Sequence, residues 1–64
     1  MVKVNGELLD IAGNTVSEYL NAFNYDTKRI VVEINEAIVP KLQYDNTVIC
    51  DGDVVEVVSF VGGG

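Results

Sequence analysis

The stretch VKVNGELLDIAGNTVSEYLNAFN, residues 2–24, decides the fold because it contains the signals for a hairpin and then for a helix. Asn5-Gly6 separates two short apolar runs, and this dipeptide favours a tight hairpin since both residues tolerate positive φ. We therefore expect strands at about residues 1–5 and 6–11.

A short helix is expected directly after the hairpin. Thr15 and Glu18 have the spacing of a capping box, in which a hydroxyl and a carboxylate bind the backbone amides at the start of a helix. The apolar residues that fall on one face, at the spacing i, i+3, i+4 and i+7, are Val16, Tyr19, Leu20 and Phe23. The pattern predicts a helix of two to three turns that ends near Asn24, with this face in the core.

Two longer strands are expected in the second half of the chain. Residues 29–35 alternate, and their more apolar face, which should be turned to the helix, contains Ile30, Val32 and Ile34. We expect this strand to be central in the sheet. In the last strand, residues 54–61, Val55 and Val57 point opposite to Val58 and Phe60.

Short elements should connect these two strands. Asn35-Glu36-Ala37 and Asp51-Gly52-Asp53 have the composition of turns, and Ile38-Val39 is a short extended piece that ends at Pro40, which cannot donate a hydrogen bond. We expect Leu42 and Tyr44 to fill the end of the core, and Thr47-Val48-Ile49 to form a short strand or the approach to one. The order of elements indicates an α+β protein, a β-grasp fold with a mixed sheet of four to five strands packed on one main helix. Residues 1–61 should form a single domain, and residues 62–64 a flexible glycine tail.

Size and charge restrict the function. A chain of 64 residues buries only about 60% of its unfolded surface, which leaves little room for a pocket that encloses a substrate. Ten acidic residues against four basic ones give a net charge of −6, and this disfavours binding to nucleic acid or to anionic membranes. The same charge favours a basic partner surface.

The inventory of reactive side chains argues against an enzyme. The chain has no His and one cysteine, Cys50, so an internal disulfide and the usual zinc sites are not expected. We expect Cys50 to be a small buried apolar residue. Asp51 and Asp53 lack the ligand spacing of a calcium loop and fit a turn better. No signal peptide or membrane span is visible, and we expect a cytoplasmic protein.

The remaining candidate for chemistry is the sequence Gly62-Gly63-Gly64, with which the sequence ends. Because glycine has no Cβ, such a tail can enter a slot too narrow for other residues, and it would present the carboxylate of Gly64 to the active site of a partner. The alternative is a frayed end without function. Val58, Phe60 and Val61, on the last strand beside the tail, are the expected partner-binding patch. The alternative for Phe60 is a place at the edge of the small core.

Several segments together resemble the ThiS family, the small sulfur carrier proteins of thiamine thiazole synthesis. These segments are Asn5-Gly6-Glu7, Thr15-Val16, Ile34-Asn35-Glu36 with Ile38-Val39-Pro40-Lys41, Asp51-Gly52-Asp53 with Val55-Glu56-Val57-Val58, and Val61-Gly62-Gly63-Gly64. They occur in order over essentially the whole chain. One departure is Glu36, where a glycine is frequent in the family.

The resemblance implies a ubiquitin-like β-grasp fold and a protein co-substrate instead of an enzyme. A ThiF-type enzyme would use ATP with magnesium to adenylate the carboxylate of Gly64, and the adenylate would become a thiocarboxylate. The sulfur would come from cysteine through a desulfurase, and it would be delivered to a ThiG-type thiazole synthase. Gly63 and Gly64 would be the obligatory terminal pair and Gly62 a spacer, with no cofactor or metal bound by the chain itself.

Three alternatives remain open from the sequence. The small subunit of molybdopterin synthase uses the same tail chemistry on the same fold. A non-catalytic β-grasp interaction module would not need the free carboxylate. A protein modifier would form isopeptide conjugates.

Overall fold

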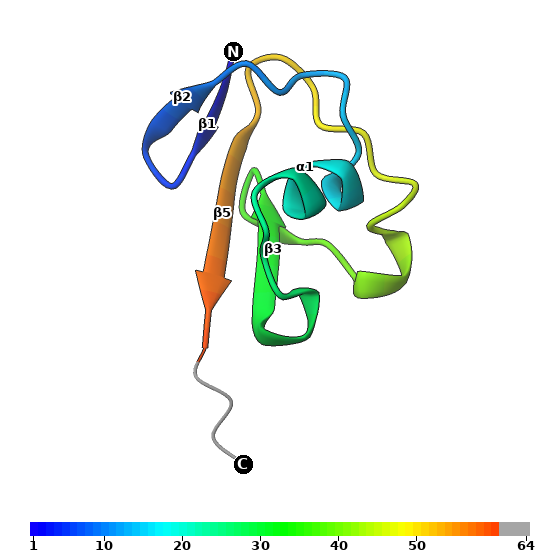
Figure 1. The fold of residues 1–64 in the computed structure, drawn as a ribbon. Coiled ribbons are helices and arrows are strands. Elements are labelled where there is room, and N and C mark those ends of the chain that lie inside the picture. Colours follow the sequence, from blue (N-terminus) through cyan, green and yellow to red (C-terminus); the bar gives the residue numbers. More distant parts are fainter. Residues whose placement is uncertain (61–64) are drawn as a thin grey trace.

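The computed structural model describes residues 1–60, and residues 61–64 lie outside the described part (Figure 1). The elements are β1 (Val2–Val4), β2 (Glu7–Leu9), α1 (Val16–Ala22), the 3₁₀ turn η1 (Thr27–Arg29), β3 (Ile30–Ile34), β4 (Ala37–Ile38), the 3₁₀ turn η2 (Lys41–Gln43) and β5 (Val54–Ser59). The strands form one sheet in the order β2-β1-β5-β3-β4. Only the β1–β5 pair is parallel among these strands, so the expected mixed β-grasp sheet is confirmed.

The first hairpin turns at the expected dipeptide. Asn5 and Gly6 have φ of 49° and 85°, the two positive values that a tight hairpin turn requires. The pairing of Val2 with Leu9 and of Val4 with Glu7 follows from this turn. Val2 and Val4 point into the core while Lys3 between them is exposed.

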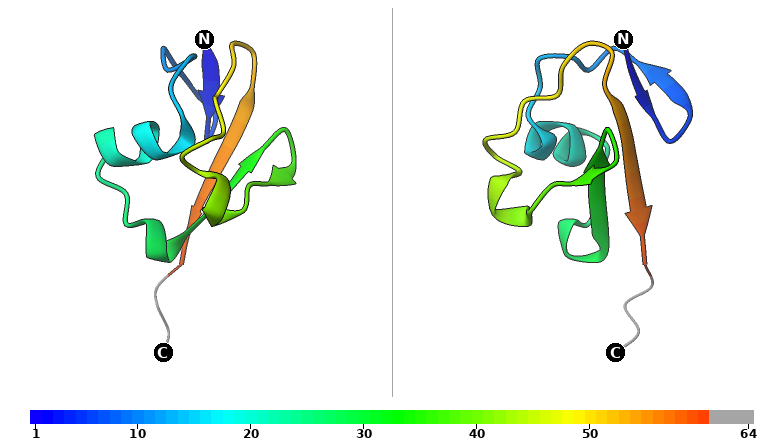
Figure 2. Two further views of the ribbon diagram at one scale, coloured as in Figure 1. Left: turned by 90° about the vertical axis from the view of Figure 1, so that its right-hand side faces the viewer. Right: turned by 180° about the vertical axis from the view of Figure 1, so that it is seen from behind.

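Helix α1 begins with the expected capping box and covers one face of the sheet (Figure 2). The Thr15 N–H donates to Glu18 Oε1 at 2.8 Å, and the Glu18 N–H donates to Thr15 Oγ1 at 3.1 Å. The helix ends at Ala22, and Phe23 caps it and is half exposed instead of buried. The chain leaves the helical path at Asn24, whose φ is 60°, so the last position of the apolar stripe lies beyond the core.

One core lies between α1 and the inner face of the sheet. Its largest fully buried side chains come from the helix, from three strands and from the loop before β5; they are Leu20, Ile30, Ile49, Val2, Val16, Val32 and Val55. The alternation expected for β3 and β5 is confirmed, because Ile30, Val32, Val55 and Val57 are buried.

The middle strand of the sheet is β5, and β3 is an interior strand between β5 and β4, as expected. Residues 47–49 form an isolated bridge between Thr15 and Val48, and this segment leads toward β5 without being a strand itself. Two expectations about individual residues were wrong. Leu42 lies on the outside of η2 and is 95% exposed, whereas Tyr44 is buried as expected. Cys50 is exposed, since its neighbour Ile49 takes the core position.

The helices within residues 1–60 include none with the length and apolar character needed to cross a membrane.

Candidate functional site

The outer face and the end of β5 form the candidate site. Val58 is 50% exposed and Phe60 is 47% exposed, so both lie on the surface of the domain and Phe60 does not complete the core. Figure 1 shows β5 running past the end of the β1–β2 hairpin toward the last described residues. The other residues predicted for the site, Val61, Gly62, Gly63 and Gly64, lie outside the described residues, and their roles stay predictions.

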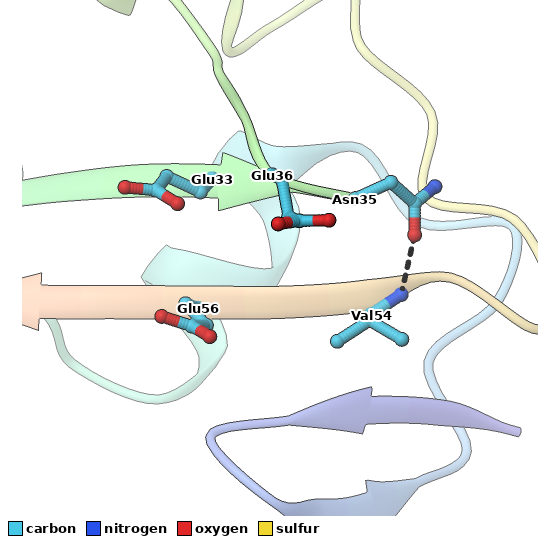
Figure 3. Close-up of a pocket in the computed structure, with 5 residues that line it drawn as sticks. All are labelled: Glu33, Asn35, Glu36, Val54 and Glu56. Carbon is cyan, nitrogen blue, oxygen red and sulfur yellow. Dashed lines mark hydrogen bonds between the residues drawn. The ribbon is translucent and has the colours of Figure 1, made fainter.

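Two asparagine side chains hold β5 at separate points. Asn35 Oδ1 accepts from the Val54 N–H at 3.0 Å (Figure 3). The Asn35 N–H donates to the Val54 carbonyl at 2.7 Å. On the opposite edge, Asn5 Oδ1 accepts from the Val57 N–H at 2.9 Å, and Asn5 Nδ2 donates to the Val57 carbonyl at 3.2 Å. The strand that leads to the tail is therefore fixed in position from both sides.

The turn before β5 uses both of its aspartates. Asp53 Oδ1 accepts from Asn35 Nδ2 at 3.0 Å, and Asp53 Oδ2 accepts from the Cys50 N–H at 2.9 Å. Asp51 pairs with the ammonium group of Met1, and the hydrogen bond from this group holds the pKa of the Asp51 carboxyl below its usual value. Both side chains thus have structural partners, as the turn interpretation requires. Residues 1–60 contain no cluster of three or more potential metal-ligating His, Cys, Asp or Glu side chains.

A shallow hollow of about 360 Å³ lies on the outer face of the sheet, lined by Glu33, Asn35, Glu36, Val54 and Glu56 (Figure 3). Glu33 and Glu56 are direct cross-strand partners, and like charges in this arrangement destabilise a sheet. No Lys or Arg lines the hollow. Glu36 lies in the turn after β3 with φ of 72°, in the left-handed region that favours glycine.

Sequence reasoning missed this group of carboxylates. The alternation placed Glu33 on the outer face of one strand and Glu56 on the outer face of another, which was the available signal. Their contact depends on the register between β3 and β5, and that register joins segments about twenty residues apart through long-range pairing.

The outer face of β5 combines exposed apolar and acidic side chains. An exposed apolar strip, Val54, Val58 and Phe60, adjoins a carboxylate-lined hollow on the same face. A surface of exposed apolar and acidic groups fits a partner that offers apolar and basic groups together.

Tyr19, in contrast, is a core residue. Its burial, and after that its hydrogen bond with Tyr25, raises the pKa of its hydroxyl.

Comparison of the sequence and the structure with known proteins points to one family. The ThiS family model matches residues 2–64. The chain belongs to the ThiS family. A ThiS crystal structure from Geobacter metallireducens superimposes with a TM-score of 0.79 at 34% identity, covering 98% of this chain and 97% of that one. The β-grasp fold expected from the sequence is that of this ThiS neighbour.

Curated relatives of this ThiS-family chain include sulfur carrier proteins and thiazole synthases. A sulfur carrier protein ThiS from Thermus thermophilus is 38% identical over 64 residues and is covered completely, as is this chain. A second one, from Bacillus subtilis, is 40% identical over 50 residues, which cover 78% of this chain and 76% of the relative. A thiazole synthase from Paramagnetospirillum magneticum is 39% identical over 62 residues, which cover 95% of this chain and only 19% of that protein.

Proposed function

We propose that this chain carries sulfur for thiazole formation in thiamine biosynthesis, as a protein co-substrate acted on by partner enzymes in the cytoplasm. The observation that carries the proposal is the ThiS-family match through residue 64, together with full-length similarity to a relative named as a sulfur carrier. Similarity to a segment of a thiazole synthase supports that enzyme as the acceptor of the sulfur.

The proposed chemistry takes place at the carboxylate of Gly64. A carboxylate oxygen attacks the α-phosphorus of ATP, which is bound with magnesium by a ThiF-type enzyme, and pyrophosphate leaves. The terminal sulfur of a persulfide from a cysteine desulfurase then attacks the acyl carbon, and AMP leaves. A thiol finally cleaves the sulfur–sulfur bond, which releases the thiocarboxylate and leaves a disulfide on the donor side. A ThiG-type thiazole synthase accepts the sulfur.

The body of the domain supplies recognition in this proposal. Entry of Gly62, Gly63 and Gly64 into a narrow site costs ordering entropy, which contacts elsewhere must offset. Val58 and Phe60 are exposed on the strand that leads to the tail, and they are the proposed contacts for the adenylating enzyme, together with Val61. The carboxylates of the outer hollow add attraction for a basic rim.

Intact mass spectrometry tests the chemistry. The chain is incubated with ATP, magnesium, a ThiF-type enzyme and a desulfurase with cysteine, and we expect one oxygen of Gly64 to be replaced by sulfur. A chain extended by one residue after Gly64 and a chain without Gly64 are the controls, and both should stay unmodified while they melt like the parent. Sulfur transfer to the extended chain, or none to the parent with active partners, would refute the proposal.

A second experiment tests the contact surface. Phe60→Ala should weaken binding to the ThiF-type enzyme by roughly tenfold, because a half-exposed aromatic side chain at an interface contributes more to binding than to folding. Leu42→Ala is the matched control, since Leu42 is exposed but lies on η2, away from β5. Equal affinity of the two variants would show that Phe60 is not part of the contact.

A further inference from the structure

The two edges of β5 are paired to different extents. On one edge, β3 accompanies β5 from the pair Ile34–Val55 to the pair Ile30–Ser59. On the other edge, the ladder with β1 contains two pairs, Lys3–Val54 and Val4–Val55. Figures 1 and 2 show the consequence: the β1–β2 hairpin turns back while β5 continues beside β3 alone.

The alternation of the backbone determines which groups of β5 face the shorter edge. Val54 and Phe60 bond toward β3, since the Asn35 N–H donates to the Val54 carbonyl and the Phe60 N–H donates to the Arg29 carbonyl at 2.9 Å. Residues 55, 57 and 59 must then direct their N–H and C=O groups toward β1. The Asn5 N–H accordingly donates to the Val55 carbonyl at 2.9 Å.

The side chain of Asn5 extends the hydrogen bonding along this edge of β5 to one further residue. Its carboxamide bonds both the N–H and the C=O of Val57, as the backbone of a neighbouring strand would. Ser59 is the next residue whose backbone faces this edge, and within residues 1–60 no strand pairs with it there. Ser59 is also exposed.

An extended polypeptide is the ligand that fits such an edge. The backbone of a strand offers a C=O and an N–H at the spacing that a β-edge presents, and strand addition is a common mode of recognition between proteins. We propose that the adenylating enzyme adds an extended segment to β5 at Ser59, in line with the Asn5 side chain and opposite β3. The identity of this partner rests on the proposed function, whereas the free edge does not.

The position of the edge also defines the chemistry of the added segment. One residue of the added segment would pair with Ser59. The two residues that flank it in the added segment would point to the outer face, beside Val58 and Phe60, which are both about half exposed. These positions therefore suit apolar side chains. A second copy of this chain fits less well, because each copy carries a net charge of −6 and the carboxylates Glu33 and Glu56 on the same face.

Amide hydrogen exchange tests the strand addition without any change to the protein. We expect the Ser59 amide to exchange rapidly in the free chain and to become at least about tenfold slower in the saturated complex with the adenylating enzyme. The Phe60 amide, already bonded to Arg29, serves as the internal reference. A Ser59 amide that exchanges equally fast in the complex overturns the proposal, and so does one that is protected in the free chain through self-association.

A variant of the backbone at Ser59 measures how much the proposed strand addition contributes to the affinity for the adenylating enzyme. The chain can be synthesised with N-methyl-Ser59, which removes the Ser59 N–H but none of the bonds to β3, and the matched control is Ser59→Ala, which keeps the N–H. We expect the N-methylated chain to bind the enzyme roughly tenfold more weakly and the control to bind within about twofold of the parent. Equal affinities overturn the proposal; if the N-methylated chain does not fold, the exchange result decides.

The two proposals fail in distinguishable ways. A parent chain that is adenylated normally while Ser59 stays unprotected refutes the strand addition alone. A parent chain that binds with a protected Ser59 but is never adenylated refutes the proposed function alone.

Discussion

Asn5 has two roles: its backbone forms the hairpin turn, and its carboxamide binds the backbone of Val57. Replacing Asn5 by glycine separates these two roles. Glycine accepts the φ of 49° without strain, so the turn itself should persist. The carboxamide that bonds the N–H and the C=O of Val57 is lost. The variant therefore reports how much this side chain contributes to holding β5 in the middle of the sheet.

The expected magnitude follows from the two bonds. A hydrogen bond of this kind contributes a net of about 0.5–1.5 kcal/mol, so the loss of both should lower the free energy of unfolding by about 2 kcal/mol. In a domain of this size, that corresponds to a fall in Tm of roughly 10 °C. Asn5→Ala should cost about 1 kcal/mol more, because alanine at positive φ is strained.

Urea unfolding followed by circular dichroism measures these differences. Asn24→Gly is the matched control, because Asn24 also has positive φ, at 60°, but is exposed and lies outside the sheet. Glycine gives the unfolded chain more conformational freedom and so lowers stability at either position. Subtracting the change in free energy measured for Asn24→Gly removes this contribution. If Asn5→Gly and Asn24→Gly change stability equally, the carboxamide does not clamp Val57 and the reasoning is wrong.

Three further predictions concern charged residues of the described region. Glu36→Gly should raise the free energy of unfolding by about 1 kcal/mol in urea titrations, because φ of 72° strains a residue with a Cβ; a destabilised variant would contradict this. Glu56→Gln should stabilise by roughly 0.5 kcal/mol by removing the repulsion from Glu33, and the gain should shrink in high salt; a gain that does not depend on salt would point to another cause. Asp51→Asn should destabilise the chain at neutral pH, where the Met1 ammonium pairs with the carboxylate. Since folding lowers the pKa of Asp51, this stabilisation is present above the unfolded pKa and is lost as pH falls through the folded pKa, so parent and variant should converge in acid; a difference that persists there would refute the pairing.

The elements that could be predicted from sequence are those with local causes. Asn5-Gly6 and the Thr15–Glu18 box act over a few residues, and both have the expected geometry. The alternation along β5 placed Val58 on the exposed face, and of the two alternatives left open for Phe60 the structure shows the exposed one. In these cases the backbone conformation and the face of each side chain follow from neighbours in the chain.

The errors concern features with distant causes. Leu42 and Tyr44 are both large and largely apolar, in a segment without clear periodicity, and only the path of η2 decides that Tyr44 is buried. The meeting of Glu33 with Glu56 depends on the register between β3 and β5, and the middle position of β5 depends on its parallel pairing with β1. The family match extends through residue 64, and the roles expected for Gly62, Gly63 and Gly64 stay predictions because residues 61–64 lie outside the described structure.

The parallel pairing of β1 with β5 has a consequence for biosynthesis. β1 can pair with β2 as soon as the hairpin is made, but its other neighbour, β5, is translated some fifty residues later, so the sheet cannot close until β5 has emerged. A nascent chain interrupted before Val54 would expose two half-sheets and should be a target for proteolysis. If the proposed adenylating enzyme contacts the folded domain, as the proposed function requires, it would seldom bind a prematurely ended chain.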